Sequence, residues 1–127
     1  MRHLTGIDHV QLAMPPGPEA EAAAVAFYQD ALGITRVPKP PALAARGGCW
    51  FELPSLRIHL GVEADFRSAR KAHPALAVAD LPALVAKLTA AGIAVRPGGS
   101  EVEGAEQAYV DDPFGNRIEL IERGARR

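Results

Sequence analysis

The sequence predicts an α+β fold made of two paired copies of one βαβββ unit. Two observations predict it. An amphipathic helical pattern flanked by short β-prone runs occurs once in each half of the 127 residues. The two occurrences are separated by a mixed, charged stretch at residues 63–72. One unit alone would leave sheet edges open and only half a core, so we expect the units to pair, within the chain or across a dimer.

The first unit begins with a short β-prone run and a proline break. Its expected elements are a strand over 6–13, a helix to about residue 31, a strand over 34–37, and strands over 49–53 and 56–60. The helix carries apolar residues at positions i, i+3, i+4 and i+7, namely Ala24, Phe27, Tyr28 and Ala31. Gly33 ends it. Residues 38–48 are rich in Pro and Gly, so we expect a loop with no regular element there.

The second unit repeats this order. Its expected elements are a strand over 73–79, a helix beginning at Leu81, a strand over 93–96, a loop over 97–106 and a closing hairpin over 108–122. Asp80 is a good N-cap, and the helix stripe is Leu81, Leu84, Val85 and Leu88. Asp112-Pro113 and Gly115-Asn116 predict the hairpin turn.

Length and composition limit the function classes. The chain suits one domain, with module one at about 4–62, a linker at about 63–72 and module two at about 73–122. A net charge of −1 and the absence of a basic block beyond Arg126-Arg127 exclude an obvious nucleic-acid or membrane-surface partner. No apolar run is long enough to span a membrane. The single cysteine, Cys49, cannot form an intrachain disulfide, so we expect a cytoplasmic protein.

A carboxylate lies in the middle of the last strand. Alternation puts Arg117, Glu119 and Ile121 on one face and Ile118 and Leu120 on the other. An unpaired buried carboxylate is unfavourable. Either this face is wet or Glu119 has a cationic partner, and the histidines indicate that the partner is a metal ion.

Histidine placement follows the repeat. His9 and His73 lie in the first strands of the two units, whereas His59 and Glu119 lie in the last strands. His9 and His59 are 50 positions apart, and His73 and Glu119 are 46 apart. Three imidazoles and a carboxylate suit one divalent metal ion such as Zn, Ni, Co, Mn or Fe. Any one of these histidines alone is better explained as a structural strand residue, but matched placement of the whole set favours a metal.

Four segments resemble the vicinal oxygen chelate superfamily: Gly-Ile-Asp-His9-Val, Ile-His59-Leu-Gly-Val-Glu, His73-Pro-Ala-Leu-Ala-Val-Ala-Asp-Leu and Asp112-Pro-Phe-Gly-Asn-Arg-Ile-Glu119. This superfamily includes glyoxalase I, methylmalonyl-CoA epimerase, fosfomycin-modifying thiol transferases, extradiol dioxygenases and bleomycin-binding resistance proteins. The resemblance implies paired modules whose curved mixed sheet surrounds a cleft with a metal ion, often in homodimers. His9, His73 and Glu119 match the family's ligand positions. His59 falls where glyoxalase I-like members place Glu or Gln, which argues against a strict glyoxalase I assignment.

The resemblance also implies the chemistry. The ion would chelate two neighbouring oxygens of a small-molecule substrate, with Glu119 as a catalytic base in a lyase, isomerase or epimerase. A ring-cleaving dioxygenase or a thiol transferase on the same scaffold is an alternative. A metal-free binding protein of the resistance type is another, although it predicts loss of the ligand residues.

Strand parity indicates candidate substrate-binding residues. Gln11 shares a face with His9, Arg57 with His59, and Arg117 with Glu119. Arg57 and Arg117 could hold an anionic group, although ordinary salt bridges at a sheet edge would explain them equally well. Tyr109 is a candidate for lining the pocket, with a core position as the alternative.

Overall fold

The computed structural model describes residues 1–99 and 102–124 and contains two four-stranded mixed sheets. The first consists of β1 (Val10–Met14), β2 (Arg36–Val37), β3 (Cys49–Leu53) and β4 (Leu56–Val62). Its strand order is β1-β4-β3-β2, with β1 parallel to β4 and the other pairs antiparallel.

The second sheet repeats this topology. It consists of β5 (Ala75–Ala77), β6 (Arg96–Pro97), β7 (Ala105–Asp111) and β8 (Arg117–Arg123). Its order is β5-β8-β7-β6, with the first strand again parallel to the last. The predicted α+β fold of two βαβββ units is therefore confirmed. The two sheets are not joined into one closed sheet within the described residues.

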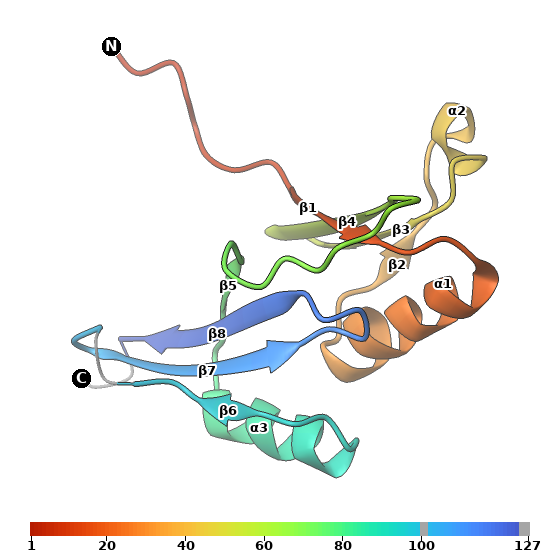
Figure 1. Ribbon diagram of the computed structural model, residues 1–127. Helices are drawn as coiled ribbons and strands as arrows, with labels where there is room; N and C mark the ends of the chain where they lie inside the picture. The colour runs from red at the N-terminus through yellow and green to blue at the C-terminus, as the bar shows by residue number, and fades with distance from the viewer. Residues whose placement is uncertain (100–101, 125–127) are drawn as a thin grey trace.

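The helices with a predicted apolar stripe pack beside the sheets (Figure 1). They are α1 (Pro18–Ala24), η1 (Val25–Ala31), which continues α1 as a π-helix, and α3 (Leu81–Ala90). The short helix α2 (Pro41–Ala44) buries none of its residues. The four predicted stripe residues of α1 and η1 are all buried. Asp80 caps α3 as predicted, because its Oδ1 accepts a hydrogen bond from the backbone N–H of Ala83.

The strand predicted over 73–79 contains only Ala75–Ala77, which form β5. Two other predicted strands are shorter than expected for a reason that they share. The strands over 34–37 and 93–96 were predicted from Ile34 and Ile93, but β2 and β6 contain only two residues each. The N–H of Ile34 bonds to the carbonyl of Tyr28, and that of Ile93 bonds to the carbonyl of Leu88. Each isoleucine thus completes the end of a helix instead of joining a sheet.

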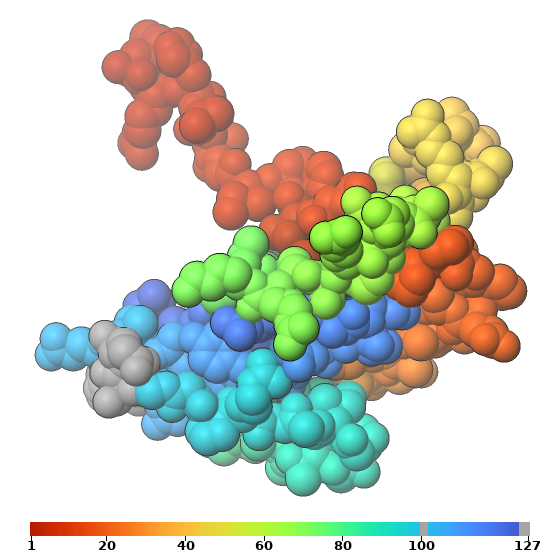
Figure 2. All heavy atoms as spheres, viewed as in Figure 1, coloured from red at the N-terminus to blue at the C-terminus, as the bar shows by residue number. Residues whose placement is uncertain are grey.

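Two further predictions need correction. The region 38–48 is not entirely loop, because Pro41–Ala44 form the short helix α2; proline fits a first helical turn, and alanine and leucine favour the rest. The first strand begins at Val10 instead of residue 6. Residues 1–9 are all exposed and extend away from the body (Figure 2). Residues 100–101 of the predicted loop over 97–106, and Arg126-Arg127, lie outside the described residues.

The turn between β7 and β8 joins the two halves of the chain. Asp112 is buried, and its oxygens accept four hydrogen bonds, from the N–H groups of Phe114 and Asn116, the Asn116 amide and the Tyr28 hydroxyl. The buried Asn116 amide also donates to the carbonyl of Ala13, 2.9 Å away in β1. The Asp-Pro-Phe-Gly-Asn segment is therefore a structural joint whose polar groups are satisfied.

The outer edges of β1 and β5 carry no neighbouring strand within the described residues. A groove of about 1150 Å³ runs between them. Leu4 and Ile7, at 89% and 85% exposure, lie in the extended segment that leads into β1. No helix in the described part of the chain is long and apolar enough to cross a membrane.

Candidate functional site

The polar face of the second sheet brings His73 and Glu119 together. Glu119 of β8 lies opposite Ala75 of β5, and His73 precedes Ala75 by two residues. The N–H of Glu119 bonds to the carbonyl of Pro74, so the segment before β5 still runs beside β8 and the imidazole reaches the carboxylate. His73 Nε2 lies 3.0 Å from Glu119 Oε1, and the two side chains are 24% and 12% exposed. The partner of the buried carboxylate within the chain is thus a histidine.

The other nitrogen of His73 fixes how this pair can bond. His73 Nδ1 lies 2.8 Å from the carbonyl oxygen of Lys71. A carbonyl only accepts, so Nδ1 carries the hydrogen and Nε2 is the nitrogen that faces Glu119. Two acceptors stay this close only around a shared proton or a cation. A metal-binding histidine commonly donates its other ring N–H to a backbone carbonyl, as His73 Nδ1 does to Lys71.

Gln107 of β7 is a site residue that the sequence analysis missed. Its Nε2 donates to Glu119 Oε2 at 2.7 Å, so both carboxylate oxygens are engaged. Its Oε1 is buried and has no partner within the described residues. Gln107 lies two residues from Tyr109 on the same face of β7, and this inward polar position in an alternating strand was the available signal.

These contacts set the charge of Glu119. Burial acts to raise its pKa, but the hydrogen bonds from Gln107 and His73, with the charge of His73, more than offset burial and lower the pKa below the ordinary 4.5. Glu119 is therefore ionised near neutral pH. An ionised carboxylate can accept a proton or bind a cation.

In the first sheet, His59 of β4 occupies the position that Glu119 occupies in the second sheet. Its Nε2 lies 2.9 Å from Glu52 Oε2, and the residue is only 5% exposed. Its ring stacks on Trp50, with centroids 3.9 Å apart and an interplanar angle of 4°. The carboxylate accepts the Nε2 hydrogen, which leaves Nδ1 as the unprotonated nitrogen.

His9 lies immediately before β1, and its ring stacks on the His59 ring, with centroids 4.3 Å apart and an interplanar angle of 22°. His9 Nδ1 lies 2.8 Å from Asp8 Oδ1, which leaves Nε2 free to bind a ligand. The hydrogen bond from His9 and the nearby Arg57 guanidinium lower the pKa of Asp8. Asp8 is thus an ionised acceptor that holds the tautomer of His9.

Strand register confirms that the two pairs are equivalent. His59 lies opposite Gln11, two residues after His9, as Glu119 lies opposite Ala75, two residues after His73. The spacing of the predicted ligands therefore has a structural origin. Each sheet presents one half of the candidate site, with one histidine just before its first strand and one candidate ligand in its last.

The remaining predicted residues lie on the same faces. The Gln11 side chain lies over Gly61, where a Cβ would come within 2.5 Å of its Nε2. Arg57 lies 3.7 Å from a Glu52 oxygen and 3.4 Å from an Asp8 oxygen. The Arg117 guanidinium lies 5.9 Å from the Tyr109 ring centre.

The four predicted ligands do not converge within one chain. Among the described residues, no group of three or more His, Cys, Asp or Glu side chains is placed to hold a metal ion. His9 and His73 line the same groove between the open edges of β1 and β5. A metal centre that used residues of both halves would need these halves to approach each other, within the chain or between two copies.

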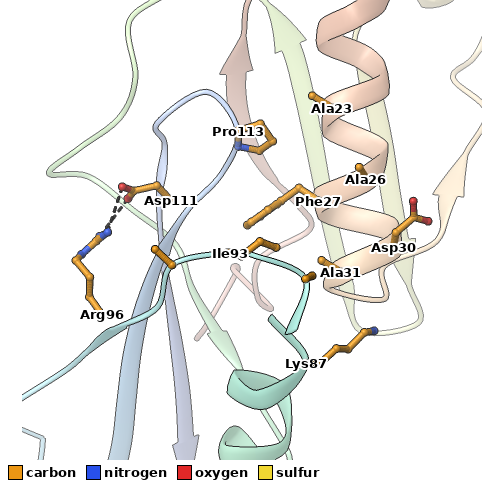
Figure 3. Close-up of a pocket in the computed structure, with 12 residues that line it drawn as sticks. Ala23, Ala26, Phe27, Asp30, Ala31, Lys87, Ile93, Arg96, Asp111 and Pro113 are labelled. Carbon is orange, nitrogen blue, oxygen red and sulfur yellow. Dashed lines mark hydrogen bonds and ion pairs between the residues drawn. The ribbon is translucent and has the colours of Figure 1, made fainter. Parts of the chain in front are cut away.

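A second cavity, of about 610 Å³, lies between η1 and the segment after α3 (Figure 3). Alanines and Phe27 form much of its wall, and Asp111 at its edge is bound by Arg96. None of the predicted site residues lines it.

Comparison with known proteins decides the family. A sequence model of the Glyoxalase/Bleomycin resistance protein/Dioxygenase superfamily matches residues 6–120. The chain belongs to this superfamily. A glyoxalase family protein from Bacillus anthracis has a solved structure with 42% sequence identity and a TM-score of 0.91, over 97% of this chain and 98% of that one.

More distant superfamily structures share the fold alone. The fosfomycin resistance protein FosX from Listeria monocytogenes is 16% identical with a TM-score of 0.73, covering 94% of each chain. A glyoxalase family protein from Enterococcus faecalis is 21% identical with a TM-score of 0.72, over 92% of this chain and 97% of that one. No curated protein matches the sequence significantly. The superfamily includes enzymes and resistance proteins, so membership alone does not assign a reaction.

Proposed function

We propose that this superfamily member is a metal-dependent enzyme of the lyase, isomerase or epimerase type, acting on a small substrate that chelates through vicinal oxygens. The observation that carries the proposal is the His73–Glu119 pair. Its carboxylate is ionised and bonded by Gln107, and its imidazole is held by the carbonyl of Lys71. These are features of ligands that have been oriented before a metal binds.

We propose His73, Glu119 and His9 as ligands of one divalent ion (Zn, Ni, Co, Mn or Fe). His59 was predicted as a fourth ligand. While the rings of His9 and His59 are stacked, their in-plane lone pairs run side by side and cannot both converge on one ion about 2.1 Å away. His59 can therefore bind only if the stack opens; in the stacked state it supports His9.

A divalent ion held there would polarise two neighbouring substrate oxygens as a Lewis acid. The chain itself supplies the proton acceptor. Glu119 is ionised near neutral pH, and Gln107 holds one of its oxygens while the other faces His73. We propose that Glu119 takes the proton next to the chelated oxygens.

We propose that two copies complete the site as a homodimer in the cytoplasm. The open edges of β1 and β5, and the exposed Leu4 and Ile7 in the segment leading to His9, support a dimer. An unprotected sheet edge is an unfavourable feature for a monomer. The buried free thiol of Cys49 is compatible with a reducing compartment.

The test is metal content, measured by elemental mass spectrometry on tag-free protein after exposure to each candidate ion. We expect about one ion per chain in the wild type and loss of the ion in His73→Ala and Glu119→Ala. His3→Ala, in the exposed N-terminal segment, and Glu106→Ala, an exposed carboxylate of β7, are the matched controls and should keep it. Absence of uptake of any ion by the wild type would refute the proposal.

One specific observation favours a second candidate. Two histidines and one carboxylate are also the ligand set of non-haem iron(II) oxygenases. A ring-cleaving dioxygenase would bind Fe(II) selectively and consume dioxygen with catechol-type substrates, which an oxygen electrode measures directly. A thiol transferase would consume a thiol instead. A metal-free binding protein would take up no ion and retain ligand binding.

A further inference from the structure

Arg117 differs from every other arginine in the described chain. It is half-buried, whereas the other arginines between residues 1 and 124 are exposed. It also makes no ion pair with any described carboxylate. A half-buried guanidinium has lost part of its hydration, so its N–H donors favour an oxyanion partner.

The absence of an internal partner for Arg117 has a structural cause. In register, Asp111 of β7 lies directly opposite Arg117 of β8, which is a favourable position for a cross-strand ion pair. Arg96 of β6, however, binds both oxygens of Asp111 at 3.1 Å each (Figure 3). The carboxylate that would neutralise Arg117 is therefore already occupied.

The equivalent arginine of the first sheet provides an internal comparison. Arg57 lies opposite Glu52, as Arg117 lies opposite Asp111. Arg57 pairs with both Glu52 and Asp8. Of two arginines at matching positions, one is neutralised by the chain, and the other has no ion pair among the residues that the structure describes.

Arg117 lies on the same face as the candidate metal ligands. Its guanidinium lies over Tyr109, and Tyr109 packs edge-on against His73 with ring centroids 5.8 Å apart. Cation–π contact with Tyr109 orients the guanidinium without using its N–H donors. Because Arg117 and Glu119 are two positions apart along β8, their Cα atoms are about 7 Å apart.

We propose that Arg117 binds an anionic group of the substrate, a carboxylate or a phosphate-type oxyanion, while the chelating oxygens of the same molecule lie at His73 and Glu119. This inference rests on the proposed function and names its substrate class as small acids that carry an oxyanion a few bonds from the chelating oxygens. A planar guanidinium binds such groups through two parallel hydrogen bonds.

The experiment compares three probes with one chelating head. Acetohydroxamate has vicinal oxygens and no further charge, malonic monohydroxamate adds a carboxylate, and phosphonoacetohydroxamate adds a phosphonate. Dissociation constants are measured by calorimetry on Ni-loaded protein. For the wild type we expect the probe with the preferred anion to bind at least about tenfold more tightly than acetohydroxamate, in line with a charge-assisted bidentate contact.

Variants test which residue is responsible for the tighter binding of the anionic probe. Arg117→Gln should lose it while binding acetohydroxamate within about twofold of wild type, which also shows that the variant is folded, and Arg117→Lys should keep part of it. Arg96→Gln should reduce the gain, because a released Asp111 can pair with Arg117. Arg46→Gln removes an exposed arginine elsewhere and should change nothing.

Equal affinity of the wild type for all three probes, or loss of the gain in Arg57→Gln instead of Arg117→Gln, overturns the proposal. Failure of the metal centre is recognised separately, as absence of metal uptake or of acetohydroxamate binding. In that event, anion binding by Arg117 is tested on metal-free protein. Inorganic phosphate at constant ionic strength should raise the melting temperature of the wild type but not of Arg117→Gln, and an equal response of both overturns the anion site.

Discussion

At the residue scale, two buried carboxylates have different roles. One stabilises the fold, and the other belongs to the candidate site. Asp112 accepts four hydrogen bonds from uncharged donors at the joint between the two halves. Glu119 is bonded by Gln107 and His73 on a polar face beside an open groove. Both are satisfied, but Asp112 and its partner Tyr28 are buried, whereas His73, the partner of Glu119, lines the groove, so Glu119 is the candidate for chemistry.

The lowered pKa of Glu119 predicts how the free energy of unfolding depends on pH in acid. A carboxyl whose pKa is depressed by folding stabilises the protein above its unfolded value of 4.5, and this contribution is lost as pH falls below 4.5 through the folded pKa. We expect the difference in unfolding free energy between metal-free wild type and Glu119→Gln to shrink over that window. Urea titrations from pH 6 to pH 3 measure it. A difference that does not vary with pH would contradict this prediction.

The raised pKa of Tyr28 predicts that the protein loses stability at alkaline pH. Burial and the neighbouring Asp112 raise its pKa well above the ordinary 10.0, so its contribution is complete below pH 10 and decreases as pH rises above 10. Tyr28→Phe should destabilise the protein by about 1–2 kcal/mol at neutral pH through loss of one hydrogen bond, and should also remove this alkaline dependence. Tyr109→Phe is the matched control, since the described residues give its hydroxyl no hydrogen bond. An equal loss in both variants would exclude the Asp112 bond as the cause.

At the element scale, the β7–β8 turn determines how the halves meet. Gly115 has a φ of +90°, and a Cβ there would lie 3.2 Å from the side chain of Ser68 in the linker. Glycine is required both for this backbone conformation and for the close approach of the linker. The turn in turn holds Asn116, whose amide bonds to the carbonyl of Ala13.

Replacing Gly115 should therefore have a larger effect than replacing another positive-φ glycine. Gly92 ends α3 with a φ of +82° and has open space around its Cβ position. We expect Gly92→Ala to cost about 1–2 kcal/mol from backbone strain alone, and Gly115→Ala to cost more because contact with Ser68 is added. Denaturant unfolding of both variants measures the difference. Equal losses would show that the Ser68 contact contributes nothing.

At the scale of the whole molecule, the two candidate half-sites lie beside the groove between the open edges of β1 and β5. One half carries His9 and the other carries His73 with Glu119, and both line or adjoin the same groove. If the proposed homodimer shares its sites, each ion is held by His9 of one copy and by the second half of the other.

Mixing variants tests this sharing. His9→Ala and His73→Ala homodimers should each bind no ion, whereas their heterodimer regains one intact site, so co-expressed protein should recover metal in the mixed species. His73→Ala with Glu119→Ala is the control pair, because both changes lie in the same half and no intact site results. Elemental analysis of the separated heterodimers gives the result. No recovery in the first pair would place each complete site within one chain.

The local sequence pattern predicted which elements form, whereas long-range packing determined where each element begins and ends. The helix stripes, the Asp80 cap and the β7–β8 hairpin follow from residues that are neighbours in the sequence, so periodicity revealed them. The short β2 and β6 and the late start of β1 depend on hydrogen bonds that a neighbouring element takes or fails to offer. A short stretch of sequence does not show which neighbouring element will take these hydrogen bonds.

The sequence by itself determined the repeated α+β fold and the matched placement of His9, His59, His73 and Glu119, because strand period and helix period are properties of local sequence. Only the tertiary structure decided which of these residues meet. It paired His73 with Glu119, stacked His9 on His59 and added Gln107. It also occupied Asp111 with Arg96, so that Arg117 has no ion pair with a carboxylate in the described part of the chain. Side-chain partnership depends on competition among groups brought together by folding, and that competition is resolved in three dimensions.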